Sequence, residues 1–272
     1  MQNSRNSLPS LLAEAENIKE GMALLAPLLN LPEVSLLMEP EISLSDSLVS
    51  LYRERVQRRR EGVPLIYILG EMEFLGCELA ITPEVLIPRP ETEILAERVI
   101  SASPTQGVWD LCCGSGCLGL SIKKALPTIE VVLSDISPEA VDLAKRNAKR
   151  NGLAVEVREG DLFAPFSGER VGCIVANPPY VSPEEYAALP PSVFHHEPMG
   201  ALLAEEGGLL FYRRMREELP SYLHPGGRFY AEIGAGQGEA LLSFFSDRHW
   251  KAPRLSQDWA GKDRFFSVTY SP

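Results

Sequence analysis

The segment Asn177-Pro178-Pro179-Tyr180 combines groups that can hold a planar NH2 group. The asparagine side chain offers a carbonyl acceptor, and Pro178 adds a backbone carbonyl without an N–H of its own. Two acceptors in fixed positions can bind both hydrogens of an amide or an exocyclic amine, while the ring of Tyr180 lies against the flat group that carries them. A rigid strand-to-loop turn with a packing tyrosine is the structural alternative, so the surrounding sequence must decide.

The residues before this motif predict its place in the fold. Residues 171–176 form a short apolar run that is typical of a buried strand. The strand ends at the motif, because proline cannot donate to a strand ladder and holds the preceding Asn177 in an extended conformation. Open α/β sheets bind ligands beyond the carboxyl ends of their strands. We therefore expect the motif to border a ligand site.

Strand and helix patterns alternate from residue 107 onward. Apolar runs predict strands over 108–111, 130–135, 155–158, 171–177, 226–233 and 264–270. Helices are predicted from the end of the glycine-rich turn 112–119 to Leu126, over 137–151, over 208–219 and after Gln237-Gly238. This order predicts an α/β fold with a doubly wound, mostly parallel sheet.

Residues 1–70 are predicted to form a separate, helical domain. Apolar residues recur at three- and four-residue spacings over 11–29, which indicates an amphipathic helix, and Pro27 is expected to break the pattern. A second helix begins near Ser45 and ends in the basic run 53–60. We interpret this run as a solvated face, with a contact patch for an acidic or RNA-bound partner as the alternative.

Two further segments complete the domain plan. Residues 71–85 are predicted to form a linking β-hairpin that turns at Gly76. Residues 86–272 then form the sheet domain, which opens with a helix from Pro90 to Ile100. Proline suits the first turn of a helix, so this last segment has a complete structural explanation without a catalytic role.

A glycine-rich string, Gly114-Ser115-Gly116-Cys117-Leu118-Gly119, follows the first predicted strand of the sheet domain. Such a turn lets the backbone pass close to a ligand at a helix N-terminus. Asp135, at the end of the second strand, is placed to bind ribose hydroxyls. These features fit either NAD or S-adenosylmethionine.

Two acidic residues favour S-adenosylmethionine. Asp110 precedes the glycine turn, where a carboxylate suits an ammonium and a sulfonium better than a pyrophosphate. After the third strand, Asp161 offers an acceptor for an adenine amino group, and Leu162-Phe163 an apolar lip for the ring. In the structural alternative, Asp135 only caps the next helix and Asp161 only makes a turn.

Composition bounds the remaining possibilities. The chain has 272 residues, of which 45% are hydrophobic and 23% charged, as in globular proteins. No signal peptide or apolar run long enough for a membrane span is present, so we expect a cytoplasmic protein. Three of the five cysteines lie within 112–117, a spacing that suits neither disulfides nor a metal site. The net charge of −11 disfavours non-specific binding to nucleic acid.

Several segments together resemble one family. They are PLIYILG at 64–70, LIPRPETE at 86–93, DLCCGSG at 110–116, NPPY at 177–180, EPMGALLAEEGGLLFYRR at 197–214, HPGGRFYAEIGAGQG at 224–238 and GKDRFF at 261–266. With a helical N-terminal domain, they are similar to the PrmC/HemK family of N5-glutamine methyltransferases, which act on peptide chain release factors. The resemblance covers nearly the whole chain and implies a Rossmann-like methyltransferase domain with a seven-stranded sheet.

The resemblance also implies the reaction. The cofactor would be S-adenosyl-L-methionine, with S-adenosyl-L-homocysteine as product, and the substrate the glutamine of the Gly-Gly-Gln motif in class 1 release factors. Cys112, Cys113, Gly114, Ser115, Gly116, Asp135, Leu162 and Asn177 would touch the cofactor. Residues 177–180 would hold the glutamine, and residues 1–70 would help to recognise the release factor. The family usually has Gly-Thr at the position of Cys112-Cys113, which bears on loop geometry and cofactor affinity.

The sequence suggests a mechanism that needs positioning rather than a strong base. We expect the Asn177 side-chain oxygen and the Pro178 carbonyl to accept both amide N–H groups, so that the nitrogen lone pair faces the methyl group for in-line transfer. Tyr180 would stack on the amide. His195-His196 is expected to have a lid or packing role rather than to act as a base.

Three other functions remain open at this point. An amino-methyltransferase for adenine in DNA or RNA would use the same motif on a flipped base, but the chain has no broad basic stripe. An NAD-dependent oxidoreductase is disfavoured by Asp110 and by the 177–180 motif. A non-catalytic adaptor is excluded only by an activity measurement. We expect a monomer without sequence-specific nucleic-acid binding, membrane attachment or a metal.

Overall fold

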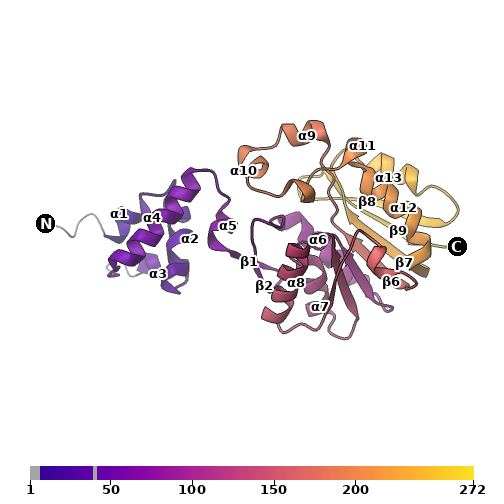
Figure 1. Cartoon of the computed structure of the whole chain (residues 1–272), viewed down its shortest axis with the longest axis horizontal. Helices are drawn as coiled ribbons and strands as arrows, with labels where there is room; N and C mark the ends of the chain where they lie inside the picture. Colours follow the sequence, from indigo (N-terminus) through magenta and orange to yellow (C-terminus); the bar gives the residue numbers. More distant parts are fainter. Residues whose placement is uncertain (1–6, 39–41) are drawn as a thin grey trace. The chain divides into compact units, whose positions relative to one another are not determined.

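The computed structural model describes residues 7–38 and 42–272. It divides into two compact units. The first comprises the chain up to Gly70 together with Pro191–His196, and the second comprises Glu71–Pro190 and Glu197–Pro272. Figure 1 draws both units and labels their helices and strands where there is room.

The first unit is helical, as the apolar spacing predicts. Its helices are α1 (Leu8–Leu12), α2 (Ile18–Leu29), α3 (Glu33–Met38), α4 (Asp46–Arg60), α5 (Leu65–Leu69) and α10 (Pro191–Phe194). The prediction of a single helix over 11–29 is wrong, because α1 ends at Leu12 and α2 begins at Ile18. Asn17 caps the start of α2, and its side chain accepts a hydrogen bond from the Glu20 amide at 2.9 Å. Pro27 lies within α2 rather than breaking it, in the helix's last turn.

The basic end of α4 is largely engaged within the first unit. Arg53 forms an ion pair with Glu14 at 2.9 Å, and Arg59 forms one with Glu20 at 3.1 Å. Ser45 caps the start of the helix, as expected, by accepting a hydrogen bond from the Leu48 amide.

The second unit contains a seven-stranded, mostly parallel sheet, which confirms the predicted fold class. The strands are β3 (Val108–Leu111), β4 (Val131–Asp135), β5 (Glu156–Glu159), β6 (Val171–Ala176), β7 (Leu223–Glu232), β8 (Trp250–Gln257) and β9 (Asp263–Tyr270). Their order is β5-β4-β3-β6-β7-β9-β8, with β9 antiparallel to both its neighbours. Strand β8 was not predicted, because Pro253 and a register shift between Lys251 and Arg254 interrupt its pattern.

Helices lie on both faces of this sheet. They are α6 (Pro90–Ser101), α7 (Cys117–Ala125), α8 (Pro138–Arg150), α12 (Leu210–Tyr222) and α13 (Gly238–Phe244), with the short α9 (Pro183–Ala187) and α11 (Glu205–Gly208) and the 3-10 turns η1 (Ala164–Phe166) and η2 (Met199–Ala201) in the loops. Trp109 and Leu111 of β3 join the core that contains residues of α12 and α13. Asp110, between them in the strand, accepts a hydrogen bond from α7 on the other face. Period-two alternation in β3 therefore serves two separate helix layers.

The start of α7 differs from the prediction. The glycine-rich turn was expected to run to Gly119, but the helix already begins at Cys117. Gly116, at φ 84°, completes the turn. A Cβ on Gly119 would lie 2.7 Å from the Leu133 side chain, so this glycine allows α7 to pack closely on β4.

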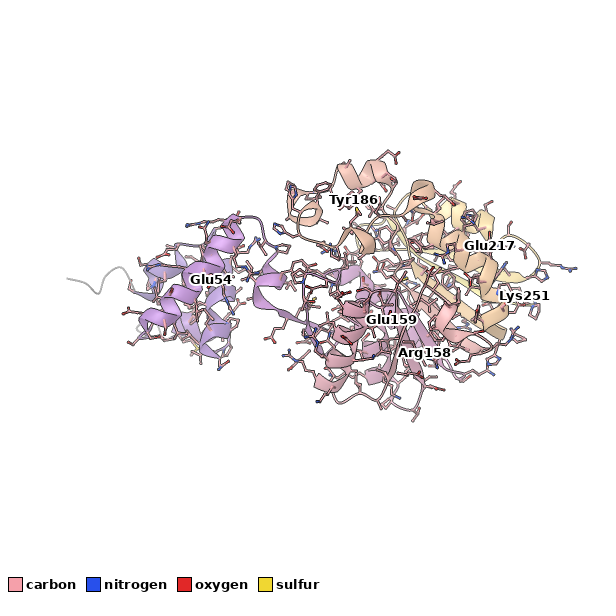
Figure 2. All side chains as sticks on the ribbon, in the orientation of Figure 1. Glu54, Arg158, Glu159, Tyr186, Glu217 and Lys251 are labelled. Atoms are coloured by element: carbon pink, nitrogen blue, oxygen red, sulfur yellow. The ribbon has the colours of Figure 1, made fainter. Side chains whose placement is uncertain are left out.

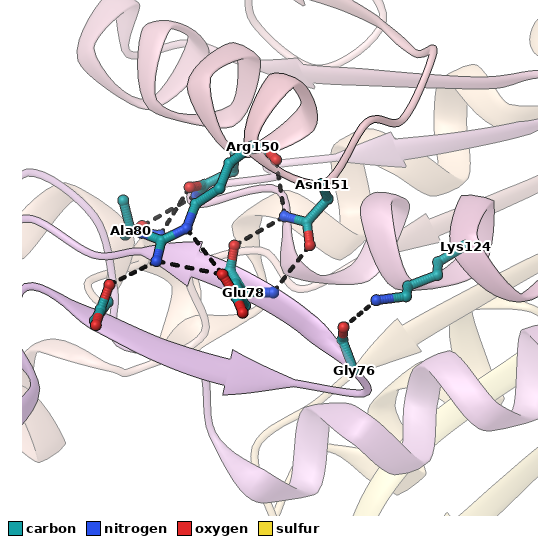
Figure 3. Close-up of polar contacts among 8 residues, drawn as sticks. Gly76, Glu78, Ala80, Lys124, Arg150 and Asn151 are labelled. Atoms are coloured by element: carbon teal, nitrogen blue, oxygen red, sulfur yellow. Dashed lines mark hydrogen bonds and ion pairs between the residues drawn. The ribbon is translucent and has the colours of Figure 1, made fainter. Parts of the chain in front are cut away.

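The predicted hairpin is present as β1 (Glu71–Phe74) and β2 (Cys77–Ala80). Figure 3 shows how α8 holds it. The Asn151 side chain accepts from the Glu78 amide at 2.9 Å and donates to the Glu78 carbonyl at 2.8 Å. The Asn147 side chain binds the Ala80 amide at 2.8 Å and the Ala80 carbonyl at 3.0 Å in the same way. The hairpin is thus fastened to the sheet unit by two side-chain amides.

Arg158 lies on the edge strand β5 and is labelled in Figure 2. It forms ion pairs with Glu156 at 2.8 Å and with Glu169 at 2.7 Å. All five cysteines are free thiols. Over residues 7–38 and 42–272, no helix has the length and apolar character to cross a membrane.

Candidate active site

The site lies at the point of the sheet where the order of successive strands changes sides. Strands β3 and β6 are neighbours, but the chain continues from β3 to β4 on one side and from β6 to β7 on the other. Leu111 is paired with Ala176, so the residues that follow them, Cys112 and Asn177, leave the sheet side by side. Doubly wound sheets bind their ligands at such a switch point. A pocket of about 560 Å³ opens here.

The pocket brings together most of the residues that the sequence predicted. Its lining includes Cys112, Cys113, Gly114, Ser115, Asp135, Asp161, Leu162, Asn177 and Pro179. Four predicted residues are not among the lining residues: Asp110, Gly116, Pro178 and Tyr180. Of these four, Asp110 accepts the Gly119 amide of α7, and Tyr180 donates to the Glu232 carboxyl group.

The glycine-rich loop forms one wall. Its backbone is fixed by two hydrogen bonds to β4, from the Cys113 amide to the Ser134 carbonyl at 3.0 Å and from the Gly114 amide to the Asp135 carboxylate at 2.8 Å. Cys112 has a φ of 58°, a conformation that favours glycine. Burial raises the pKa of its thiol, and the nearby Asp135 raises it further. Cys112 is therefore a neutral wall residue rather than a nucleophile.

Two of the predicted carboxylates line the pocket. Asp135 accepts the Gly114 amide through Oδ2 and the Ser137 amide through Oδ1, at 3.0 Å. A carboxylate has about four acceptor positions, so the Asp135 oxygens retain capacity for a ligand. Asp161 is held through Oδ2 by the guanidinium of Arg214 at 2.7 Å.

The apolar lip is shorter than expected. Leu162 is buried and lines the pocket. Phe163 belongs to the core instead, where its ring stacks on that of Tyr222 at 4.6 Å between centroids. Ile136, which is exposed, faces the pocket and adds apolar surface that the sequence reading did not include.

Asp110 lies fully buried beneath the loop. Its Oδ2 accepts a hydrogen bond from the Gly119 amide at 2.7 Å, and its Oδ1 has no hydrogen-bond partner among the described residues. Burial raises the pKa of this carboxyl to about 7. Its observed contact braces the first turns of α7, so the glycine wall depends on this side chain for its position.

Asn177 presents an unused acceptor at the pocket. Its Nδ2 donates to the Thr92 hydroxyl at 3.5 Å, whereas its Oδ1 is buried and has no partner among the described residues. A buried acceptor without a partner is costly, and native proteins rarely keep one without a functional reason. Because Asn177 lines the pocket, a ligand N–H group is the natural partner for its Oδ1.

A buried carboxylate that the sequence analysis missed lies behind this motif. Glu232, at the end of β7, is 1% exposed. It accepts a hydrogen bond from the Thr92 hydroxyl at 2.7 Å and another from the Tyr180 hydroxyl at 3.1 Å. Burial raises the pKa of Glu232. The available signal was a charged residue at the end of an apolar strand, Phe229-Tyr230-Ala231-Glu232.

The two histidines lie elsewhere. His195 and His196 belong to the first compact unit, and neither is among the residues lining the pocket. His195 contacts the ring of Phe194 edge-on, with 5.0 Å between centroids.

Two segments of the chain match family models. Residues 7–70 match the model described as PrmC N-terminal domain, and residues 90–228 match the model described as Methyltransferase small domain.

Full-length relatives agree with these matches. The release factor glutamine methyltransferase of Chlamydia trachomatis serovar D is 41% identical over 91% of this chain and 86% of the relative. That of Geobacter sulfurreducens is 40% identical over 89% of this chain and 85% of the relative. A solved methyltransferase from Pyrococcus furiosus shares the fold with a TM-score of 0.58 at 14% identity, covering 79% of this chain and 98% of that chain.

Proposed function

This chain belongs to the release factor glutamine methyltransferase family, and from that premise we propose the reaction that its pocket performs. It transfers a methyl group from S-adenosyl-L-methionine to the side-chain amide nitrogen of the glutamine in the Gly-Gly-Gln motif of class 1 release factors. The observation that carries the assignment is the Oδ1 of Asn177, which is buried at the pocket and has no hydrogen-bond partner in the part of the chain that the structure describes. A glutamine amide supplies the N–H donor that this oxygen lacks.

Asn177 acts on the amide by accepting a hydrogen bond from one of its two N–H groups. An amide nitrogen is a poor nucleophile because its lone pair is delocalised into the carbonyl. Acceptors fixed on one side of the NH2 group, Asn177 Oδ1 and the Pro178 carbonyl, favour a pyramidal nitrogen with an available lone pair. These acceptors bind more strongly as positive charge develops on nitrogen, so they stabilise the transition state selectively. Transfer of the methyl group leaves S-adenosyl-L-homocysteine and a positively charged, methylated nitrogen, which then releases its surplus, acidic proton to water.

The residues of the pocket fit S-adenosyl-L-methionine, which supplies an activated methyl group when bound. Asp135 has acceptor capacity for ribose hydroxyls at the end of β4. Ile136 and Leu162 provide apolar surface for the adenine ring. Gly114 lets the loop backbone lie close to the cofactor. Asp161 binds Arg214 through Oδ2, and its Oδ1, without a partner among residues 7–38 and 42–272, would accept from the adenine amino group.

The helical unit up to Gly70 is proposed to recognise the release factor, and the protein to act as a monomer. The match of residues 7–70 to the PrmC N-terminal domain supports the first part. A variant lacking residues 1–70 should then methylate a free Gly-Gly-Gln peptide and the intact factor at similar rates. The full chain should prefer the intact factor.

Transfer of a labelled methyl group tests the reaction. The purified chain is incubated with methyl-labelled S-adenosyl-L-methionine and a class 1 release factor, beside the same factor with its Gly-Gly-Gln glutamine changed to alanine, and beside adenine-rich DNA and RNA. Label on the intact factor alone is the expected result. Label on nucleic acid would overturn the proposed substrate in favour of adenine. Asn177→Ala should lose on the order of 100-fold in kcat while binding the cofactor.

A further inference from the structure

We propose that Glu232, acting through Thr92, fixes the orientation of the Asn177 amide so that its oxygen, and not its nitrogen, faces the substrate. Glu232 and Thr92 are positioning residues, and this inference rests on the proposed function. An asparagine side chain can flip by half a turn, which exchanges an acceptor for a donor at the same place. Only the orientation with the oxygen in the pocket can receive a substrate N–H.

The direction of each hydrogen bond in this series follows from the two oxygens of Glu232, which both act as acceptors. The Thr92 hydroxyl donates to Glu232 Oε2 at 2.7 Å, and the Tyr180 hydroxyl donates to Glu232 Oε1. A hydroxyl has one proton, and that of Thr92 is engaged by Glu232. Thr92 then offers only lone pairs to Asn177, so it can bind the Nδ2 of that residue but not the Oδ1. A flipped Asn177 would place two acceptors against each other.

Burial gives this arrangement its strength. Thr92 and Glu232 are each 1% exposed, although Thr92 and Asn177 are both among the residues that line the pocket. A flipped Asn177 would therefore turn its Oδ1 toward a Thr92 hydroxyl whose proton is already bound to a buried carboxyl group. Unpaired polar groups are costly in such a place. The contact between Asn177 and Thr92, at 3.5 Å, is long. We therefore assign most of the preference to repulsion in the flipped state rather than to this bond.

The same carboxylate also holds the other end of the motif. Its Oε1 accepts the Tyr180 hydroxyl at 3.1 Å, three residues beyond Asn177. The Glu232 backbone is fixed in turn, because its carbonyl accepts the Tyr212 hydroxyl at 2.7 Å. One buried side chain on β7 thus sets the orientation of both polar side chains in the 177–180 segment.

Thr92→Val provides the sharpest test, because it keeps the shape of the side chain and removes the hydroxyl. Thr92→Ser keeps the hydroxyl and is the matched control. We expect Thr92→Val to lower kcat for release factor methylation by roughly 10- to 100-fold, with the Kd of S-adenosyl-L-methionine, measured by calorimetry, within about twofold. Thr92→Ser should stay within about threefold of the wild type. Glu232→Gln, whose amide can accept or donate, should give an intermediate loss of kcat.

The outcomes separate this inference from the proposed function. If Asn177→Ala is inactive while Thr92→Val and Glu232→Gln keep kcat within threefold of the wild type, the orientation role is wrong and the proposed reaction stands. If Thr92→Val weakens cofactor binding as much as kcat, its role is structural and the inference is overturned. If Asn177→Ala itself stays active, the proposed use of Asn177 fails. Should Thr92→Val not fold, Glu232→Gln against Thr92→Ser decides, because equal rates in these two would contradict the inference.

Discussion

Gly208 gives the most direct test of how tightly the 177–180 motif is held. It lies at the end of α11 with a φ of 84°, and a Cβ built on it would lie 2.2 Å from the Tyr180 carbonyl oxygen and 2.4 Å from Gln237 Nε2. These two atoms bind each other at 2.8 Å. Gly208→Ala must therefore displace the backbone of Tyr180, the side chain of Gln237, or both.

The size of the effect follows from these distances. Real Cβ contacts stay beyond 3.0 Å, so the Tyr180 carbonyl and the new methyl group must separate by about 0.8 Å. A misplacement of about 1 Å can cost a factor of 100 in rate, so we expect kcat/KM to fall by 10- to 100-fold. Alanine at positive φ costs roughly 1–2 kcal/mol, and the strained or lost Gln237 bond roughly 1 kcal/mol more. The free energy of unfolding should thus fall by about 2–3 kcal/mol.

Gly207→Ala is the matched control. Gly207 has a φ of 63°, but a Cβ there would meet nothing within 4 Å. This variant carries the backbone strain without the collision, so it should lose only roughly 1–2 kcal/mol and keep near-normal kcat/KM. Urea unfolding and steady-state methylation of a release factor measure both quantities. Equal losses of activity in the two variants would refute the argument that contact with Tyr180 matters.

Three further substitutions, two of them with a matched control, probe Cys112 in the pocket wall and two buried residues behind it. Cys112→Gly should raise the free energy of unfolding by up to about 1 kcal/mol in urea titrations, since it relieves a positive φ, whereas Cys113→Gly should not. Asn147→Ala should lower the free energy of unfolding by roughly 2–3 kcal/mol, because the buried hydrogen bonds to Ala80 and to the Ser115 carbonyl are lost. Asn151 is less buried, so Asn151→Ala should lower the free energy of unfolding by about 1 kcal/mol or less. Equal losses in the two variants would contradict the argument from burial. Burial raises the pKa of Asp110 from 3.8 to about 7. Between pH 3.8 and pH 7 the folded state therefore keeps a proton on this carboxyl group that the unfolded state has released, so the free energy of unfolding falls as the pH rises through this range. From pH 5 to 7 this contribution falls by roughly 2 kcal/mol, because the carboxyl group in the folded state is itself about half ionised at pH 7. Asp110→Asn should remove this change; an unchanged pH slope in the variant would show that another group titrates.

The parts of the fold that could be predicted are those determined by neighbouring residues in the sequence. Turn residues and strand periodicity located the hairpin, and a run of apolar residues ending in proline located β6. Strand β8 was not predicted, because Pro253 and a register shift disturb its alternating pattern. Pairing with β9 over the rest of its length holds this strand in the sheet. The start of α2 escaped because apolar spacing continues across the break at Asn17.

The candidate site divides in the same way. Asp135 and Asn177 each follow directly from a strand end, so their place at the pocket could be read from the chain. Thr92 and Glu232 are 140 residues apart in sequence and meet only through packing of α6 against β7. No spacing rule relates such residues. Asp110 also shows that a carboxylate next to a loop can bind the backbone of the helix that follows the loop, which only the fold reveals.

Asn147 of α8 and Asn151, which caps the end of that helix, bear on the order in which the second unit folds. A hairpin of two four-residue strands is marginal on its own in water. Asn147 and Asn151 supply the donors and acceptors that a third strand would otherwise bring to β2. These partners lie 67 and 73 residues further along the chain, so the hairpin is synthesised before them. We therefore expect the hairpin to become stable only after α8 has formed.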